Sequence, residues 1–149
     1  MTRDSEEVLG MAEKRPNRVL GPNHDTFWEY CNKGEFRLQK CNNCGAVQFP
    51  PSPACPECLS LEMTWTPMTG TGTILSHTTF IRQYYPECPP PWHCILVQID
   101  EGPSFVTNPR DRNVPEAEMK AGTRVKVAFV DAEDAAGEFK MPLWETLKP

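Results

Sequence analysis

No stretch of this 149-residue sequence is apolar over the roughly 18 residues that a membrane-spanning helix needs, so we expect no membrane association. The charged N-terminus also lacks the apolar core of a signal peptide, which disfavours export. Positive charge is scarce: 15 Lys and Arg residues stand against 20 Asp and Glu residues, and the formal net charge is −5. This balance disfavours nonspecific nucleic-acid binding, which requires a basic surface that releases counterions. The sequence contains no Gly-rich phosphate loop and no paired catalytic carboxylates.

Cysteine, in contrast, occurs in a metal-binding spacing. Two Cys-x-x-Cys pairs, Cys41/Cys44 and Cys55/Cys58, are separated by ten residues. Together they supply the four thiolates of a tetrahedral zinc site, and Gly45 can take the positive φ that a tight metal-binding turn needs. Because sulfur fills every position, we expect a structural zinc ion with no open site for substrate.

Two alternatives to a zinc site are four unligated cysteines and a redox disulfide, although the latter needs only one Cys-x-x-Cys pair. Three further cysteines bring the total to seven. This pattern fits a reducing cytoplasm better than a disulfide framework.

The N-terminal part divides into an arm and a helix. Residues 1–22 are charged, and we expect a flexible arm that either orders on a partner or stays disordered. Residues 23–36 predict a short helix, capped by Asn23 and ended by Gly34. Its aromatic stripe, which includes Phe27 and Trp28, fits either core packing or docking onto another subunit.

The remainder of the chain has the pattern of β-strands. Residues 37–67 contain the cysteine pairs and alternate in the way strands do, which predicts a zinc ribbon. Residues 68–149 contain five further strand-like segments, with one helical turn between the third and the fourth, at residues 114–122. This is the order of an OB-fold, so the sequence predicts a mainly β protein whose ribbon precedes a five-stranded barrel.

Several motifs together resemble the DUF35 family. They are Phe27-Trp28, the segment Arg37-Leu-Gln-Lys-Cys-x-x-Cys-Gly45, the segment Gln48-Phe-Pro-Pro51, and the second cysteine pair. In the C-terminal half, Gly70-Thr-Gly-Thr73, Asp100-Glu-Gly102 and Gly122-Thr-Arg-Val-Lys-Val127 match as well. The resemblance covers roughly residues 23–145. Leu59 departs from it, because family members often carry glycine there, and we expect a slightly different second turn.

The resemblance implies a fold and a role. DUF35 proteins combine a rubredoxin-like zinc ribbon with an OB-fold and act as accessory subunits of acyl-CoA enzymes. The chain would then be a non-catalytic subunit in a hetero-oligomer with a thiolase-like enzyme that breaks or forms carbon–carbon bonds. It would stabilise that partner and help to bind the coenzyme A moiety of an acyl-CoA.

The residues themselves offer no convincing autonomous active site. A thiolase needs a nucleophilic cysteine and a basic histidine. His93 and Cys94 are adjacent in a predicted strand and so point to opposite faces. We expect Cys31 to be a buried apolar residue on the helix, and Cys88 to be an exposed thiol in a proline-rich loop.

Coenzyme A carries phosphates, so its contact calls for a cation beside an aromatic surface. We expect this contact at Arg37 and Lys40 beside Phe49, or at Arg82 beside Tyr84, and we favour the ribbon and its junction with the barrel. Arg110 and Arg112 form a further group.

Two other functions remain open: a free-standing acyl-CoA-binding module, and a single-stranded nucleic-acid-binding OB protein.

Overall fold

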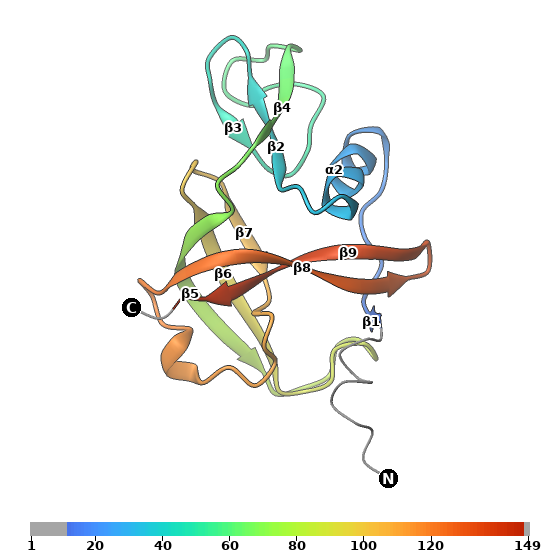
Figure 1. Cartoon of the computed structure of the whole chain (residues 1–149), viewed down its shortest axis with the longest axis vertical. Helices are drawn as coiled ribbons and strands as arrows, with labels where there is room; N and C mark the ends of the chain where they lie inside the picture. Colours follow the sequence, from blue (N-terminus) through green and yellow to red (C-terminus); the bar gives the residue numbers. More distant parts are fainter. Residues whose placement is uncertain (1–11, 148–149) are drawn as a thin grey trace.

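The computed structural model describes residues 12–147 and contains a small ribbon above a larger C-terminal domain, with one α-helix beside them (Figure 1). The order along the chain is β1 (Glu13–Lys14), α2 (Pro22–Asn32), β2 (Arg37–Cys41), β3 (Val47–Gln48), β4 (Met63–Pro67), β5 (Thr71–Phe80), β6 (Trp92–Ile99), β7 (Ser104–Thr107), the 3-10 turn η1 (Glu116–Glu118), β8 (Arg124–Asp134) and β9 (Gly137–Thr146). Within residues 12–147, no helix is both long and apolar enough to cross a membrane.

The predicted ribbon followed by an OB-fold is confirmed. The ribbon is a three-stranded sheet in the order β3-β2-β4. The C-terminal domain is one sheet in the order β1-β8-β5-β6-β7, in which β9 also pairs with β8. The turn η1 lies between β7 and β8, and Gly122 ends the predicted helical segment with a φ of 95°.

The predicted closed barrel is not fully formed. The edges near β7 and β9 meet only at one parallel bridge, between Pro109 and Trp144. Proline has no N–H to donate, so the ladder cannot continue through Pro109. Trp144 N–H donates to Asn108 O over 3.4 Å, and Arg110 N–H donates to Trp144 O over 2.9 Å. The domain is therefore an OB-like sheet that closes over a very short seam.

Helix α2 begins one residue before the predicted range 23–36 and ends within it, at Asn32, and its capping differs from the prediction. Gly21 is the N-cap, Pro22 occupies the first helical position, and Asn23 lies within the first turn. Proline is favoured there because its fixed φ suits the helix and its missing N–H costs nothing. Gly34 follows the helix with a φ of 75° and donates to Cys31 O over 2.9 Å. The predicted stop at this glycine therefore has the geometry of a helix C-terminus.

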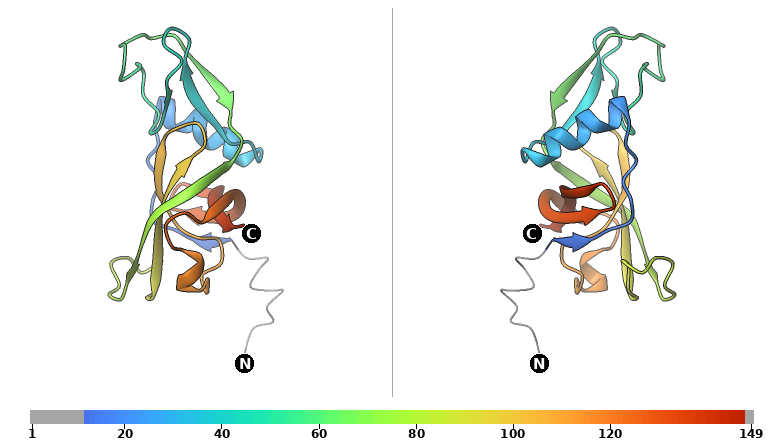
Figure 2. Two further views of the ribbon diagram at one scale, coloured as in Figure 1. Left: turned by 90° about the vertical axis from the view of Figure 1, so that its left-hand side faces the viewer. Right: turned by 90° about the vertical axis from the view of Figure 1, so that its right-hand side faces the viewer.

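The aromatic stripe of α2 packs into the core of the protein. Phe27 and Cys31 are buried, one helical turn apart, and Phe27 lies 5.3 Å from Phe49 between ring centroids. Trp28 packs edge-on against Phe139 of β9, with the ring centroids 5.3 Å apart. The side views show the helix between the ribbon and the β8–β9 hairpin (Figure 2). Core packing, rather than docking onto another subunit, accounts for these side chains.

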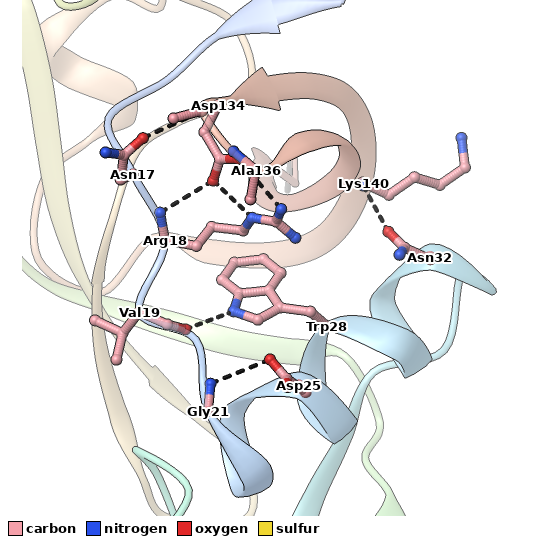
Figure 3. Close-up of polar contacts among 11 residues, drawn as sticks. Asn17, Arg18, Val19, Gly21, Asp25, Trp28, Asn32, Asp134, Ala136 and Lys140 are labelled. Atoms are coloured by element: carbon pink, nitrogen blue, oxygen red, sulfur yellow. Dashed lines mark hydrogen bonds and ion pairs between the residues drawn. The ribbon is translucent and has the colours of Figure 1, made fainter.

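Residues 12–21, called the strap below, run along the C-terminal domain. Glu13 and Lys14 pair in parallel with Ala132 and Glu133 at the end of β8. Further along, Arg18 forms an ion pair with Asp134, and Val19 O accepts a hydrogen bond from the Trp28 indole (Figure 3). The part of the predicted arm that the structure describes is thus held in place by backbone and side-chain contacts, while residues 1–11 lie outside the described residues.

Candidate functional site

The four cysteines of the two pairs converge at the far end of the ribbon. Their sulfur atoms all lie within 4.8 Å of one another. The Sγ atoms of Cys41 and Cys58 are 3.5 Å apart, and those of Cys44 and Cys55 are 3.6 Å apart. Zinc–sulfur bonds of about 2.3 Å at tetrahedral angles place sulfurs about 3.8 Å apart. The four thiols are therefore positioned for a tetrahedral metal ion.

Each cysteine pair is closed by the same turn. Gly45 has a φ of 79° and donates its N–H to Cys41 O over 2.9 Å. Leu59 has a φ of 64° and donates to Cys55 O over 2.9 Å. The expectation of a different second turn is therefore wrong, because the backbone keeps one geometry and a leucine adopts the conformation that favours glycine.

Backbone N–H groups also favour the thiolate form that binds metal. The N–H of Cys44 donates to Cys41 Sγ over 3.4 Å, and this hydrogen bond is the largest of several contacts that together lower the pKa of Cys41 to about 6. A thiolate is the form of cysteine that ligates a metal ion. The first turn thus positions Cys41 for metal binding and also stabilises its thiolate form.

A glutamine network that the sequence did not indicate supports the loop between the cysteine pairs. Gln39 on β2 donates to Ser52 O over 2.9 Å and accepts from Ser52 N–H over 2.8 Å. Gln48 on β3 donates to Gln39 Oε1 over 2.7 Å, and both glutamines are buried. The sequence carries no signal for this network, because β2 also contains Arg37 and the exposed Lys40, and only the fold shows that the glutamines are buried.

The structure does not bring together the four residues proposed for coenzyme A. Arg37 is paired with Glu35 over 2.8 Å and lies 5.0 Å from the ring of Tyr30. Lys40 is exposed on β2. The ring of Phe49 faces the interior, 4.2 Å from that of Phe105 between centroids.

Arg82 belongs to a different part of the surface. It borders a cleft of about 680 Å³ between the loop that follows β5 and the outer face of β6 and β7. Phe80, Tyr84 and Tyr85 line the same cleft with exposed aromatic surface. The third cation group lies elsewhere, where Arg110 pairs with Glu145, and Arg112 with Glu13.

The three remaining cysteines are shielded rather than activated. Burial raises the pKa of the Cys31 thiol to about 12 and also raises the pKa values of Cys88 and Cys94. Cys88, expected to be exposed, is only 8% exposed because it folds into the cleft wall. His93 shares a 2.9 Å hydrogen bond with Thr79, and Cys94 Sγ accepts one from Asn108 over 3.5 Å. The two side chains thus make their hydrogen bonds with different residues, although Asn108 also donates to the backbone oxygen of His93 over 2.7 Å.

A four-cysteine metal ribbon joined to an OB-fold defines the class of protein. A family model described as the ChsH2 rubredoxin-like zinc ribbon domain matches residues 28–64, and one described as the ChsH2 C-terminal OB-fold domain matches residues 65–130. The chain belongs to the DUF35 family, with both domains of the ChsH2 type.

The fold is also found in a solved structure titled "Ltp2-ChsH2(DUF35) aldolase". The TM-score is 0.75 at 22% sequence identity, and the match covers 87% of this chain and 98% of that chain.

Two curated relatives are similar in sequence. The probable enoyl-CoA hydratase alpha subunit of Thermomonospora curvata is 28% identical over 94 residues, which cover 63% of this chain and 30% of the relative. The 3-oxo-4,17-pregnadiene-20-carboxyl-CoA hydratase alpha subunit of Mycobacterium tuberculosis is 26% identical over 126 residues, which cover 80% of this chain and 39% of the relative. The chain thus spans about a third of the length of these relatives.

Proposed function

We propose that this protein is a non-catalytic accessory subunit of an acyl-CoA-processing complex. The observation that carries the proposal is the family membership, together with relatives that are named as subunits of CoA hydratases or, in the solved structure, as part of an aldolase. The chain would stabilise a catalytic partner in a hetero-oligomer and contribute to binding of the coenzyme A moiety.

The metal in this proposal is structural zinc, held by Cys41, Cys44, Cys55 and Cys58. Four sulfur donors complete a tetrahedral shell, so bound zinc would supply folding energy rather than Lewis-acid chemistry. Reduced thiolates are required for this role, which supports a cytoplasmic location. The raised pKa values of Cys31, Cys88 and Cys94 fit a chain that leaves the chemistry to its partner.

We place the coenzyme A contact in the cleft beside Arg82. A phosphate group needs a cation that has no competing carboxylate, and an adenine ring needs an aromatic surface. Arg37 is already paired with Glu35, and Phe49 packs inward. Arg82 has no ion-pair partner among residues 12–147, and Tyr84 and Phe80 lie beside it on the cleft.

Calorimetry with coenzyme A tests this placement. Arg82→Ala should weaken binding to the complex by about tenfold, the worth of one charge-assisted contact. Arg37→Ala is the matched control and should bind as the wild type does. A loss confined to Arg37→Ala would move the contact to the ribbon.

The finer proposal is a thiolase-like partner that breaks or forms carbon–carbon bonds, and the name of the solved aldolase supports the carbon–carbon chemistry. A hydratase partner is the second candidate, favoured by the names of both curated relatives. Co-expression of the full chain with any thiolase-like subunit or hydratase subunit that neighbouring genes encode distinguishes the two. The proposal fails if no such subunit co-purifies and none gains activity or solubility from the chain.

Two other functions give different outcomes. A free-standing acyl-CoA-binding module would bind coenzyme A tightly without any partner. A single-stranded nucleic-acid-binding protein would give a salt-sensitive gel shift, which the net charge of −5 disfavours.

A further inference from the structure

The two metal-binding turns carry different residues directly after their second cysteine, and their shared geometry does not explain the difference. Gly45 and Leu59 hold equivalent places, with φ angles of 79° and 64° and the same 2.9 Å hydrogen bond back to the first cysteine of the pair. Left-handed backbone suits glycine and is unfavourable for a residue with a Cβ. Leu59 is the one non-glycine residue with positive φ among residues 12–147.

The leucine side chain gains nothing within its own chain. Leu59 is 77% exposed, and Leu61, two residues later, is 76% exposed. Both lie on the ribbon, in the loop between β3 and β4, and the ribbon stands at the top of the molecule (Figure 1). A strained backbone that presents an exposed apolar side chain is a feature that the fold itself does not require.

The charge around these leucines has one sign. Residues 42–62 contain Glu57 and Glu62 and no lysine, arginine or histidine. Four thiolates around one divalent ion would add further negative charge. An acidic surface repels nucleic acid, anionic membranes and a second copy of itself, and attracts a basic surface.

We propose that the ribbon tip, Glu57–Glu62, docks onto the catalytic partner subunit. Leu59 and Leu61 enter an apolar pocket on that subunit, and a basic rim around the pocket faces Glu57 and Glu62. This inference rests on the proposed function for the existence of a partner, and it adds the surface that binds it. A few central apolar side chains dominate such interfaces.

The test uses the full chain and the catalytic subunit recovered by co-expression. Leu59→Gly should weaken the complex by about tenfold or more, while its melting temperature stays equal to or above that of the wild type. Leu61→Ser should weaken the complex similarly at unchanged stability. Leu75→Ser, at an exposed leucine of the C-terminal domain, is the matched control and should bind normally. Raising NaCl from about 50 to about 500 mM should slow association of the wild type.

Each other result has a definite meaning. Unchanged affinity of Leu59→Gly and Leu61→Ser in a complex that does form overturns the docking site and leaves the accessory function standing. A lowered melting temperature of Leu59→Gly assigns the leucine a structural role and overturns the proposal. Self-association of the wild-type chain that Leu59→Gly abolishes would identify a contact between copies instead. If no catalytic subunit binds at all, the proposed function fails first and the docking site fails with it.

Discussion

Arg18 forms a hydrogen-bonded ion pair with Asp134, a residue 116 positions later in the chain. The backbone N–H and Nε of Arg18 donate to Asp134 Oδ2 over 3.0 and 2.7 Å, and Nη2 donates to Oδ1 over 3.2 Å (Figure 3). The guanidinium also lies 3.9 Å from the centroid of the Phe139 ring. The two side chains are only 10% and 1% exposed, so this pair is shielded from solvent in a way that surface ion pairs are not.

Breaking this ion pair should destabilise the protein markedly. Arg18→Ala leaves the Asp134 carboxylate buried without its partner, and we expect a loss of about 3 kcal/mol in the free energy of unfolding. A double-mutant cycle with Asp134→Asn, followed by chemical denaturation, measures the coupling. The exposed pair of Lys140 and Asp131 is the control and should couple by less than about 1 kcal/mol. Equal coupling energies for the two pairs would contradict the expectation.

The same carboxylate predicts a pH dependence. Hydrogen bonds from Arg18 hold the pKa of Asp134 at about 2, whereas an unfolded aspartate has a pKa of about 3.9. Because the folded value is the lower one, its stabilising contribution is complete above about pH 4 and is lost as the pH falls towards about 2. That contribution is about 2 kcal/mol.

The comparison of wild type with Asp134→Asn isolates this effect, because acid also protonates the metal-binding thiols in both proteins. The difference between their free energies of unfolding should be constant from about pH 7 to about pH 5 and shrink between about pH 4 and pH 2. A difference that persists at low pH would show that the carboxylate is not titrating in this range.

Phe49 should be essential to the joint between the ribbon and the C-terminal domain. Its ring contacts Phe27 of α2 and Phe105 of β7, with centroids 5.3 and 4.2 Å away. We expect Phe49→Ala to cost about 3 kcal/mol of stability, as large cavities in aromatic clusters do. Phe80→Ala, at a ring that is 37% exposed, should cost less than about 1 kcal/mol in the same denaturation experiment. Comparable losses would mean that Phe49 does not join the two parts.

Removing a metal ligand should unfold the ribbon and abolish partner binding together. Cys41→Ser or Cys58→Ser breaks the four-sulfur set, and in small sites metal-binding energy is folding energy. Metal content by mass spectrometry should fall from one zinc ion per chain to none, in parallel with loss of co-purification. Cys94→Ser, outside the cluster, should keep its metal. Normal partner binding by Cys58→Ser would exclude the ribbon from the interface.

The sequence predicts those features that short-range patterns encode. The spacing of Cys41, Cys44, Cys55 and Cys58 indicates the metal cluster, and alternation with glycine-marked turns indicates the strands of the OB-fold. Gly34 and Gly122 end helical segments where their φ angles require glycine.

Long-range packing was not predictable from those patterns. The charge of residues 1–22 predicts a flexible arm. The residues around Arg18 do not indicate that it pairs with Asp134, 116 positions later in the chain. Cys88 looks exposed in its proline-rich loop, yet the loop folds over the cleft and buries it. Phe49 looked available beside Arg37 and Lys40, but its ring points into the joint with Phe105. In each case a tertiary contact overrides what the neighbouring residues indicate.

The separation between Arg18 and Asp134 also bears on how the protein is made. Cys41 and Cys58 are only 17 residues apart, so the ribbon can capture its metal while β8 is still to be synthesised. The strap is synthesised before the ribbon, but Arg18 cannot form its ion pair until Asp134 has left the ribosome. Between completion of β4 at Pro67 and synthesis of Asp134, a nascent chain would therefore carry a finished metal site and a strap without its ion-pair partner, and such an unattached segment is accessible to proteases.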